Sequence, residues 1–198
     1  VLDIGANDGT MLATYATAGI KRVGCEPANN LVDALKKNTE YVMHDFWDYD
    51  RYMTLAREWG FGKAKVITAI GMFYDLEDPN KFIKDAQRAL ADDGIFVAQL
   101  MCLAPMIEKN DLGNICHEHL EYYSLDSLKY LCESNGLEMF KIEENSVNGG
   151  SYRIFARHYK GTGITFNEKY AREEILAFAK RLESNRKQCV AFIELEVA

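Results

Sequence analysis

The most constraining feature of this chain is a short strand that runs directly into a glycine turn. Residues 1–4 are apolar apart from Asp3, and the pattern Asp3-x-Gly5-x-Asn7-x-Gly9 follows at once. Glycines in such a turn let the backbone approach a ligand closely. A second strand-like run, residues 22–25, ends in Glu26-Pro27. In an open α/β sheet both strand ends lie at the crevice where ligands bind, so the sequence predicts a site for an adenosine-bearing cofactor.

Strand-like runs alternate with helical patterns through the first half of the chain. We expect strands at residues 1–4, 22–25, 41–43, 65–70 and 95–100, and helices at residues 10–18, 31–37, 53–59, 80–90 and 103–109. Asp78 is placed to cap the helix at 80–90, and Asp92-Asp93-Gly94 is typical of a turn. This alternation predicts a parallel sheet with helices on both faces.

The second half of the chain has a different pattern. Ser124 is placed to cap a helix to about residue 134, and residues 137–143 and 152–158 flank Gly149-Gly150 as two strands that pair antiparallel. Residues 166–196 indicate a long charged helix, whose run 180–187 is interpreted as a solvated face. The sequence therefore predicts an α/β fold with a Rossmann-like, doubly wound, mostly parallel sheet and an antiparallel C-terminal hairpin.

Composition narrows the range of partners. The chain has 198 residues and a formal net charge of -7, which argues against nucleic acid or an anionic membrane as a partner. No apolar run approaches the ~20 residues of a membrane span, and no signal peptide is visible. The five cysteines are scattered without a CxxC pair, which is typical of reduced thiols in a cytoplasmic protein. No pattern indicates an oligomeric state.

Two kinds of cofactor suit a glycine turn after the first strand. A dinucleotide site has the pattern G-x-G-x-x-G and places the pyrophosphate on a helix N-terminus. Here Asn7 replaces the middle glycine, and Asp8 puts a negative charge where the pyrophosphate would sit. That charge opposes a diphosphate but suits the sulfonium and amino group of S-adenosylmethionine, while Glu26 is placed to accept hydrogen bonds from the ribose hydroxyls. The alternative that the glycines form only a tight turn stays open.

Residues 1–10 resemble the first motif of the class I S-adenosylmethionine-dependent methyltransferases, and Glu26 resembles their second. The resemblance implies that Asp45 and Phe46 lie near the adenine. It also implies that Ile70-Gly71-Met72 lines the methionine side and the transferring methyl group. S-adenosylmethionine would then be the cofactor and S-adenosylhomocysteine the product. The implied cofactor residues are Asp3, Gly5, Asn7, Asp8, Gly9, Glu26, Pro27, Asp45, Phe46, Ile70, Gly71 and Met72.

The segment 114–124, Asn-Ile-Cys-His-Glu-His-Leu-Glu-Tyr-Tyr-Ser, is the most unusual stretch. One interpretation is a metal site with His117, His119 and Glu121, although this spacing matches no known ligand set. A second is a polar loop without chemistry. A third is acid–base catalysis, because a neutral imidazole near pH 7 is suited to removing a proton and Glu118 could orient it. Tyr74 and Asp75, which follow the expected fourth strand, are also candidates to lie near an acceptor.

A more specific resemblance comes from several motifs in order: the turn at 3–9, Glu26-Pro27, Ile107-Glu-Lys-Asn110, His117-Glu-His119, and Gly149-Gly150-Ser151-x-Arg153. Together they resemble the sugar C-methyltransferases, which act on nucleotide-linked 4-keto deoxysugars. The resemblance implies that His119 is the base and Glu118 assists it, with His117 structural and no metal. It implies that the acceptor is bound by Cys116, Tyr122, Asn148 and Gly149. Cys116 stands where the family usually has tyrosine, and Asn148 where it often has histidine.

The same resemblance bears on domain organisation. The family's cysteine-rich N-terminal region and its C-terminal domain have no counterpart in these 198 residues. We therefore expect a methyltransferase domain at residues 1–165, and a helix at 166–198 that leads toward a C-terminal domain. Two other functions stay open, namely an O- or N-methyltransferase acting on another small molecule and a cofactor-binding module without activity.

Overall fold

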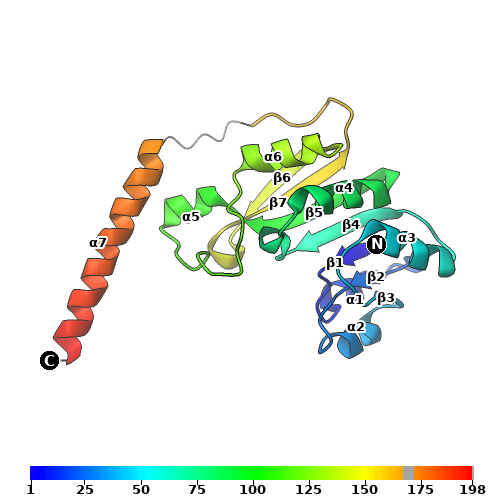
Figure 1. Cartoon of the computed structure of the whole chain (residues 1–198), viewed down its shortest axis with the longest axis horizontal. Helices are drawn as coiled ribbons and strands as arrows, with labels where there is room; N and C mark the ends of the chain where they lie inside the picture. Colours follow the sequence, from blue (N-terminus) through cyan, green and yellow to red (C-terminus); the bar gives the residue numbers. More distant parts are fainter. Residues whose placement is uncertain (167–171, 198) are drawn as a thin grey trace.

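The computed structural model describes residues 1–166 and 172–197, which form one seven-stranded sheet with helices packed against it (Figure 1). The strand order is β3-β2-β1-β4-β5-β7-β6, in which β1 to β5 are parallel and β7 is antiparallel to both neighbours. The strands are β1 (Leu2–Ile4), β2 (Val23–Cys25), β3 (Tyr41–Met43), β4 (Ala64–Ile70), β5 (Leu90–Met101), β6 (Leu137–Asn145) and β7 (Ser151–His158). The predicted α/β class and its antiparallel C-terminal pair are confirmed.

Two hydrophobic clusters lie on opposite faces of the sheet. Along β3, Tyr41 and Met43 pack into the large cluster while Val42 between them packs into the small one, because successive side chains of a strand point to opposite faces. The small cluster includes Leu12 and Leu35 from the helices α1 (Thr10–Ala13) and α2 (Val32–Asn38). The large cluster holds residues of α3 (Tyr49–Glu58), α4 (Pro79–Ala89) and α6 (Leu125–Ser134). Helices therefore cover both faces, as predicted.

Local capping chemistry explains the starts of α3, α4 and α6. Asp78 accepts a hydrogen bond from Lys81 N at the start of α4, and Ser124 forms a capping box with Ser127 at the start of α6. The predicted start of α3 at residue 53 is wrong, because Asp48 caps the helix and begins it at Tyr49. The predicted extent of the first helix is also wrong. It ends at Ala13, and the Thr14 hydroxyl bonds back to Met11 O.

The predicted turn at residues 92–94 is also wrong, because β5 continues through it. Ala64 pairs with Leu90 and Val66 pairs with Ile95, so β5 carries four residues where β4 carries one. The polar, glycine-containing segment is accommodated as an irregularity within the strand, with Asp92 and Asp93 exposed. The strand therefore starts earlier than its apolar pattern indicates.

The C-terminal helix α7 (Arg172–Val197) stands beside the sheet rather than on it, next to the short helix α5 (Leu103–Lys109) (Figure 1). The sequence predicted this helix from residue 166. Phe166 instead packs against the large cluster, and residues 167–171 lie outside the described residues. Within the described ranges, no helix is long and apolar enough to cross a membrane.

Candidate functional site

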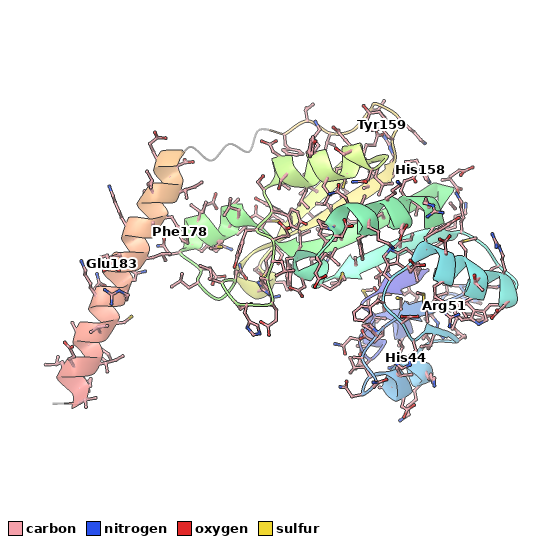
Figure 2. The ribbon with its side chains drawn as sticks, in the orientation of Figure 1. His44, Arg51, His158, Tyr159, Phe178 and Glu183 are labelled. Carbon is pink, nitrogen blue, oxygen red and sulfur yellow. The ribbon has the colours of Figure 1, made fainter. Side chains whose placement is uncertain are left out.

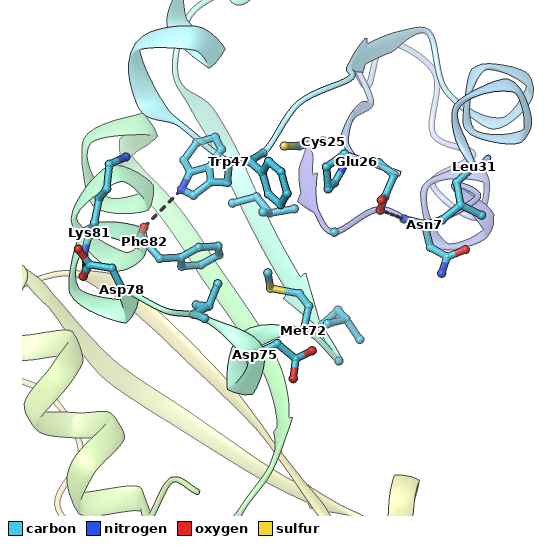
Figure 3. A pocket seen from close by; sticks show the side chains of 17 residues that line it. Asn7, Cys25, Glu26, Leu31, Trp47, Met72, Asp75, Asp78, Lys81 and Phe82 are labelled. Atoms are coloured by element: carbon cyan, nitrogen blue, oxygen red, sulfur yellow. Dashed lines mark hydrogen bonds between the residues drawn. The ribbon is translucent and has the colours of Figure 1, made fainter. Parts of the chain in front are cut away.

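A cavity of about 530 Å³, here called cavity 1, lies at the carboxyl ends of β1 to β4 (Figure 3). Strand β1 pairs with β2 on one side and β4 on the other, so the cavity lies where the strand order reverses. Eight of the predicted cofactor residues line it: Gly5, Asn7, Glu26, Pro27, Phe46, Ile70, Gly71 and Met72. These residues come from four separate chain segments, and only the parallel sheet brings them together.

The turn after β1 needs a left-handed backbone. Gly5, Asn7 and Gly9 have φ of 74°, 53° and 80°, a region that glycine and asparagine adopt most readily. A Cβ atom on Gly5 would lie 2.9 Å from Met72 Cγ, so the turn packs directly against the segment after β4. Asn7 can therefore replace the glycine of a dinucleotide motif without changing the path of the turn.

Glu26 is buried at the cavity with its carboxylate held by two backbone groups. Asn7 N donates to Oε2 at 2.9 Å (Figure 3), and Ala28 N donates to Oε1 at 2.9 Å. Each carboxylate oxygen can accept two hydrogen bonds, so each keeps one position open. The carboxylate is thus oriented to receive a pair of neighbouring hydroxyl groups, as a ribose presents.

Asp3 lies beneath the turn rather than on the cavity wall. It is 3% exposed and accepts a 2.6 Å hydrogen bond from Thr68 Oγ1. Burial raises the pKa of this carboxyl from 3.8 to about 6, the Thr68 bond opposes the rise, and the nearby Glu26 charge adds to it. A cation bound in cavity 1 would favour the ionised form of this buried acid.

Three other predicted cofactor residues lie away from the lining of cavity 1. Asp8 accepts a hydrogen bond from Thr10 N, which lowers the pKa of its carboxyl. A Cβ on Gly9 would lie 2.8 Å from Leu35 Cδ1, so Gly9 allows helix α2 to pack closely. Asp45 accepts from Phe46 N and lies 3.9 Å from Arg51. These residues shape the turn and the loop after β3 in this structure.

A second cavity of about 720 Å³, cavity 2, lies beyond the end of β5. Its walls come from the residues after β4, the end of α5, the loop at 110–119, and the 3-10 turn η2 (Val147–Gly149). His119, Asn148 and Gly149 line it, as does Tyr74. Tyr122 lines a small adjoining space instead, and Cys116 and Glu118 are not among the residues lining either cavity.

The His119 ring is fixed from two sides. Its Nδ1 lies 2.8 Å from the carbonyl oxygen of Asn114, and only an N–H can bond there, so Nδ1 carries the proton and Nε2 is left as an acceptor. The Tyr74 ring stacks against it with centroids 4.3 Å apart. Tyr122 donates its hydroxyl to the same Asn114 carbonyl at 3.3 Å. Asn114 thus orients both side chains through its backbone carbonyl, a role that its side-chain type in the sequence could not indicate.

The other members of the His-Glu-His motif point elsewhere. His117 has a 90% exposed side chain and its Nδ1 lies 3.3 Å from Glu118 Oε2. Hydrogen bonds from the Glu118 backbone and from Cys116 lower the pKa of the Glu118 carboxyl, with smaller effects of the two histidines. The structure thus pairs Glu118 with His117, while a backbone carbonyl orients His119. No group of three metal-ligating side chains occurs within residues 1–166 and 172–197.

The 3-10 turn η1 (Phe73–Asp75) connects the two cavities. Tyr74 donates its hydroxyl to Gly71 O at 2.9 Å, and its own carbonyl accepts from the backbone of Leu120 at 2.9 Å. The next residue, Asp75, lines cavity 1 (Figure 3). Burial raises the pKa of its carboxyl, and a protonated His119 would oppose that rise. His119 and the cofactor side of cavity 1 therefore share one short turn.

Comparison with known proteins places the chain in a family. A family model described as a methyltransferase domain matches residues 1–142. The chain belongs to this methyltransferase family. The match spans the cofactor turn, the loop with His119 and most of β6, so it includes every residue that lines cavity 1.

The chain also resembles individual proteins. It is 31% identical over 157 residues to the C-methyltransferase NovU of Streptomyces niveus. The aligned region covers 79% of this chain but only 37% of NovU, so the chain spans little more than a third of that relative. Among solved structures, magnesium protoporphyrin IX methyltransferase ChlM from Synechocystis PCC 6803, with bound SAH, superposes with a TM-score of 0.58 and 13% identity over 80% of this chain and 73% of that one. The [4+2]-cyclase SpnF superposes with a TM-score of 0.57 and 15% identity, and the match covers 81% of this chain and 75% of SpnF. The structural likeness therefore shows the fold.

Proposed function

We propose that this chain is the catalytic domain of an S-adenosylmethionine-dependent methyltransferase that binds the cofactor in cavity 1. The residues present fit the group. Glu26 keeps two acceptor positions for the ribose hydroxyls, and Gly5 leaves room beside Met72. The acids Asp3 and Asp75 lie under and beside the cavity, where they would favour a sulfonium and an ammonium over a diphosphate.

We further propose that the acceptor binds in cavity 2 and is methylated on carbon, with His119 as the base. The observation that carries this proposal is that His119 lines cavity 2 with its Nδ1 held by the Asn114 carbonyl, which makes Nε2 the nitrogen that can accept a proton, while Asp75 on the adjoining turn η1 lines cavity 1. The relative NovU, a C-methyltransferase by name, supports the same chemistry. The proposed acceptor is a nucleotide-linked keto-deoxysugar, the substrate class that the family resemblance implies. Its ketone matters for the chemistry, because an imidazole base can remove the neighbouring C–H proton only when an enolate can form.

In the proposed step, His119, Asn114 and Tyr74 act on the acceptor and its proton. S-adenosylmethionine, when bound, would supply the methyl group, and the electron pair of the broken carbon–sulfur bond would remain on sulfur. His119 Nε2 takes the proton from the carbon beside the ketone, and the Asn114 carbonyl holds the ring at Nδ1 and stabilises the resulting imidazolium. The carbon's freed electron pair forms the new bond to the methyl group. Tyr74 keeps the imidazole in place by stacking on it.

The experiment is deuterium exchange into a keto-sugar nucleotide, with two matched variants. His119→Ala should abolish exchange at the acceptor carbon while S-adenosylhomocysteine still binds. His117→Ala, two residues away and exposed, should exchange as the wild type does. Methylation by His119→Ala at the wild-type rate would show that the base assignment is wrong. Cofactor binding without turnover on any acceptor would favour a binding module without activity.

An O- or N-methyltransferase is the second candidate, because the free Nε2 of His119 could equally take a proton from a hydroxyl or amine. Methyl transfer to such an acceptor without carbon exchange would identify it. We also propose a cytoplasmic location, which the free cysteines support. The proposed division is a methyltransferase domain at 1–165, followed by a C-terminal segment that contains α7.

A further inference from the structure

One turn of α7 packs against α5, although the two elements are far apart in the sequence. Phe178 is 8% exposed and forms a small apolar cluster with Met106 and Ile107 of α5. In Figure 2, Phe178 lies on the side of α7 that faces α5, while Glu183 lies farther along the helix. Most of the helix beyond this contact is exposed. The contact is therefore local, and it lies at the helix that leads into cavity 2.

Arg181 fixes the end of α5. Its Nη2 donates to the carbonyl oxygen of Ile107 at 2.8 Å, and its Nε donates to Asn110 Oδ1 at 2.7 Å. Carbonyls in the last turn of a helix lack a partner within the helix, and an arginine is a favourable donor to them. Asn110 caps α5 in a left-handed conformation with φ of 53°. Arg181 thus holds both a terminal carbonyl and the capping side chain, at the point where the wall of cavity 2 begins.

Helix α5 also contacts the turn at 147–150, which forms another wall of cavity 2. Lys109 Nζ donates to Gly149 O at 2.7 Å. A Cβ on Gly149 would lie 2.3 Å from Asp111 Oδ2, and one on Gly150 would lie 2.5 Å from Pro105 Cβ. The turn at 147–150 therefore packs directly on α5 and the residues after it. Helix α5 lies between α7 and this turn, and a displacement of α5 would displace both walls.

We propose that Arg181 is a positioning residue of the acceptor cavity, acting through the end of α5 on Asn110 and Gly149. This inference rests on the proposed function, because it takes cavity 2 as the acceptor site. Cavity 1 is lined by residues between 4 and 82, whereas Arg181 bonds to residues 107 and 110. Loss of Arg181 therefore affects acceptor binding and leaves cofactor binding unchanged. The sequence indicated a solvated charged run at 180–187, so this role arises only from the tertiary contact.

The first test needs no acceptor. Amide hydrogen exchange is compared in wild type, Arg181→Met and Arg186→Met, the last being a matched control because Arg186 is paired with Glu183 on α7 itself. Arg181→Met should raise exchange at residues 107–114 and 147–150, and leave residues 1–10 and 23–27 unchanged. Equal profiles for the two variants, or a rise spread evenly over the chain, would overturn the inference.

The second test measures the acceptor directly, using a keto-sugar nucleotide in the methyl-transfer assay. Arg181→Met should raise KM for the acceptor about tenfold, the size expected from losing hydrogen bonds made by a charged donor, with the Kd of S-adenosylhomocysteine unchanged. Arg181→Lys should recover part of the loss, and Arg186→Met should match the wild type. If the wild type transfers no methyl group, the proposed function fails, and the exchange test still decides whether Arg181 holds the walls of cavity 2.

Discussion

Asp3 under the cofactor turn provides the sharpest prediction of stability against pH. Its carboxyl has a pKa of about 6 in the folded chain, against an ordinary value of 3.8, chiefly because of burial. The folded chain therefore keeps this proton to higher pH than the unfolded chain does. The stabilising contribution is fully present below pH 3.8 and is lost as the pH rises through 6. A difference of about two pH units corresponds to about 3 kcal/mol of folding free energy.

The perturbation is Asp3→Asn, which keeps an oxygen for the Thr68 hydroxyl and removes the titration. The free energy of unfolding of the variant minus that of the wild type should increase by about 2.4 kcal/mol between pH 4 and pH 7.5, because part of the full effect already lies below pH 4. Urea unfolding of both proteins across this range measures it, and other acidic groups cancel in the difference. The control Asp8→Asn, in the same turn, should show no such increase, because the pKa of Asp8 is lowered.

The same substitution tests the site. An ionised Asp3 would favour a cationic ligand, so S-adenosylmethionine should bind wild type more tightly as the pH rises from 5 to 7. Asp3→Asn should bind it more weakly at pH 7.5 and without that pH dependence. A difference in unfolding free energy that is flat between pH 4 and pH 7.5 would refute the electrostatic reasoning, whatever the binding result.

Three further predictions concern the framework. Burial alone would raise the pKa of the Glu138 carboxyl. Hydrogen bonds from Lys160 N, Thr162 N and Arg157 outweigh burial and lower this pKa to about 2. The ionised Glu138 therefore stabilises the fold fully above pH 4.5, and this contribution is lost as the pH falls through 2. Glu138→Gln should lower Tm more at pH 7 than at pH 3, and an equal decrease in Tm at both pH values would contradict this reasoning. Gly149→Ala should cost about 1–2 kcal/mol, because φ is 79° and the new Cβ would meet Asp111, and denaturant unfolding should detect it. Ile83→Ala removes a fully buried side chain, and calorimetry should show a loss of about 2–5 kcal/mol.

Much of the fold could be predicted because its signals are local. The strand at 137–143, the capping serine at 124 and the glycines of the first turn each act through residues a few positions away. The two helix-end errors, at α1 and α3, have local causes, whereas the other two errors arose where a distant partner decided the outcome. Residues 91–94 belong to β5 because β5 pairs with β4 on both sides of them. Phe166, predicted to begin the long helix, packs against the large cluster instead.

The sequence by itself determined the fold class and eight of the residues that line cavity 1, because the carboxyl ends of parallel strands meet at one edge of the sheet. The family resemblance already implied that His119 rather than His117 is the base, and the tertiary structure supplies a physical distinction, because His119 lines cavity 2 while the His117 side chain is exposed. Only the tertiary structure showed that the Asn114 backbone, rather than Glu118, orients the imidazole. It alone revealed Arg181 at the end of α5, since a contact across 71 residues leaves no periodic trace in the chain. The pattern of apolar residues along the chain predicts the sheet and the helices that cover it, whereas contacts between distant segments decide which side chains meet at the two cavities.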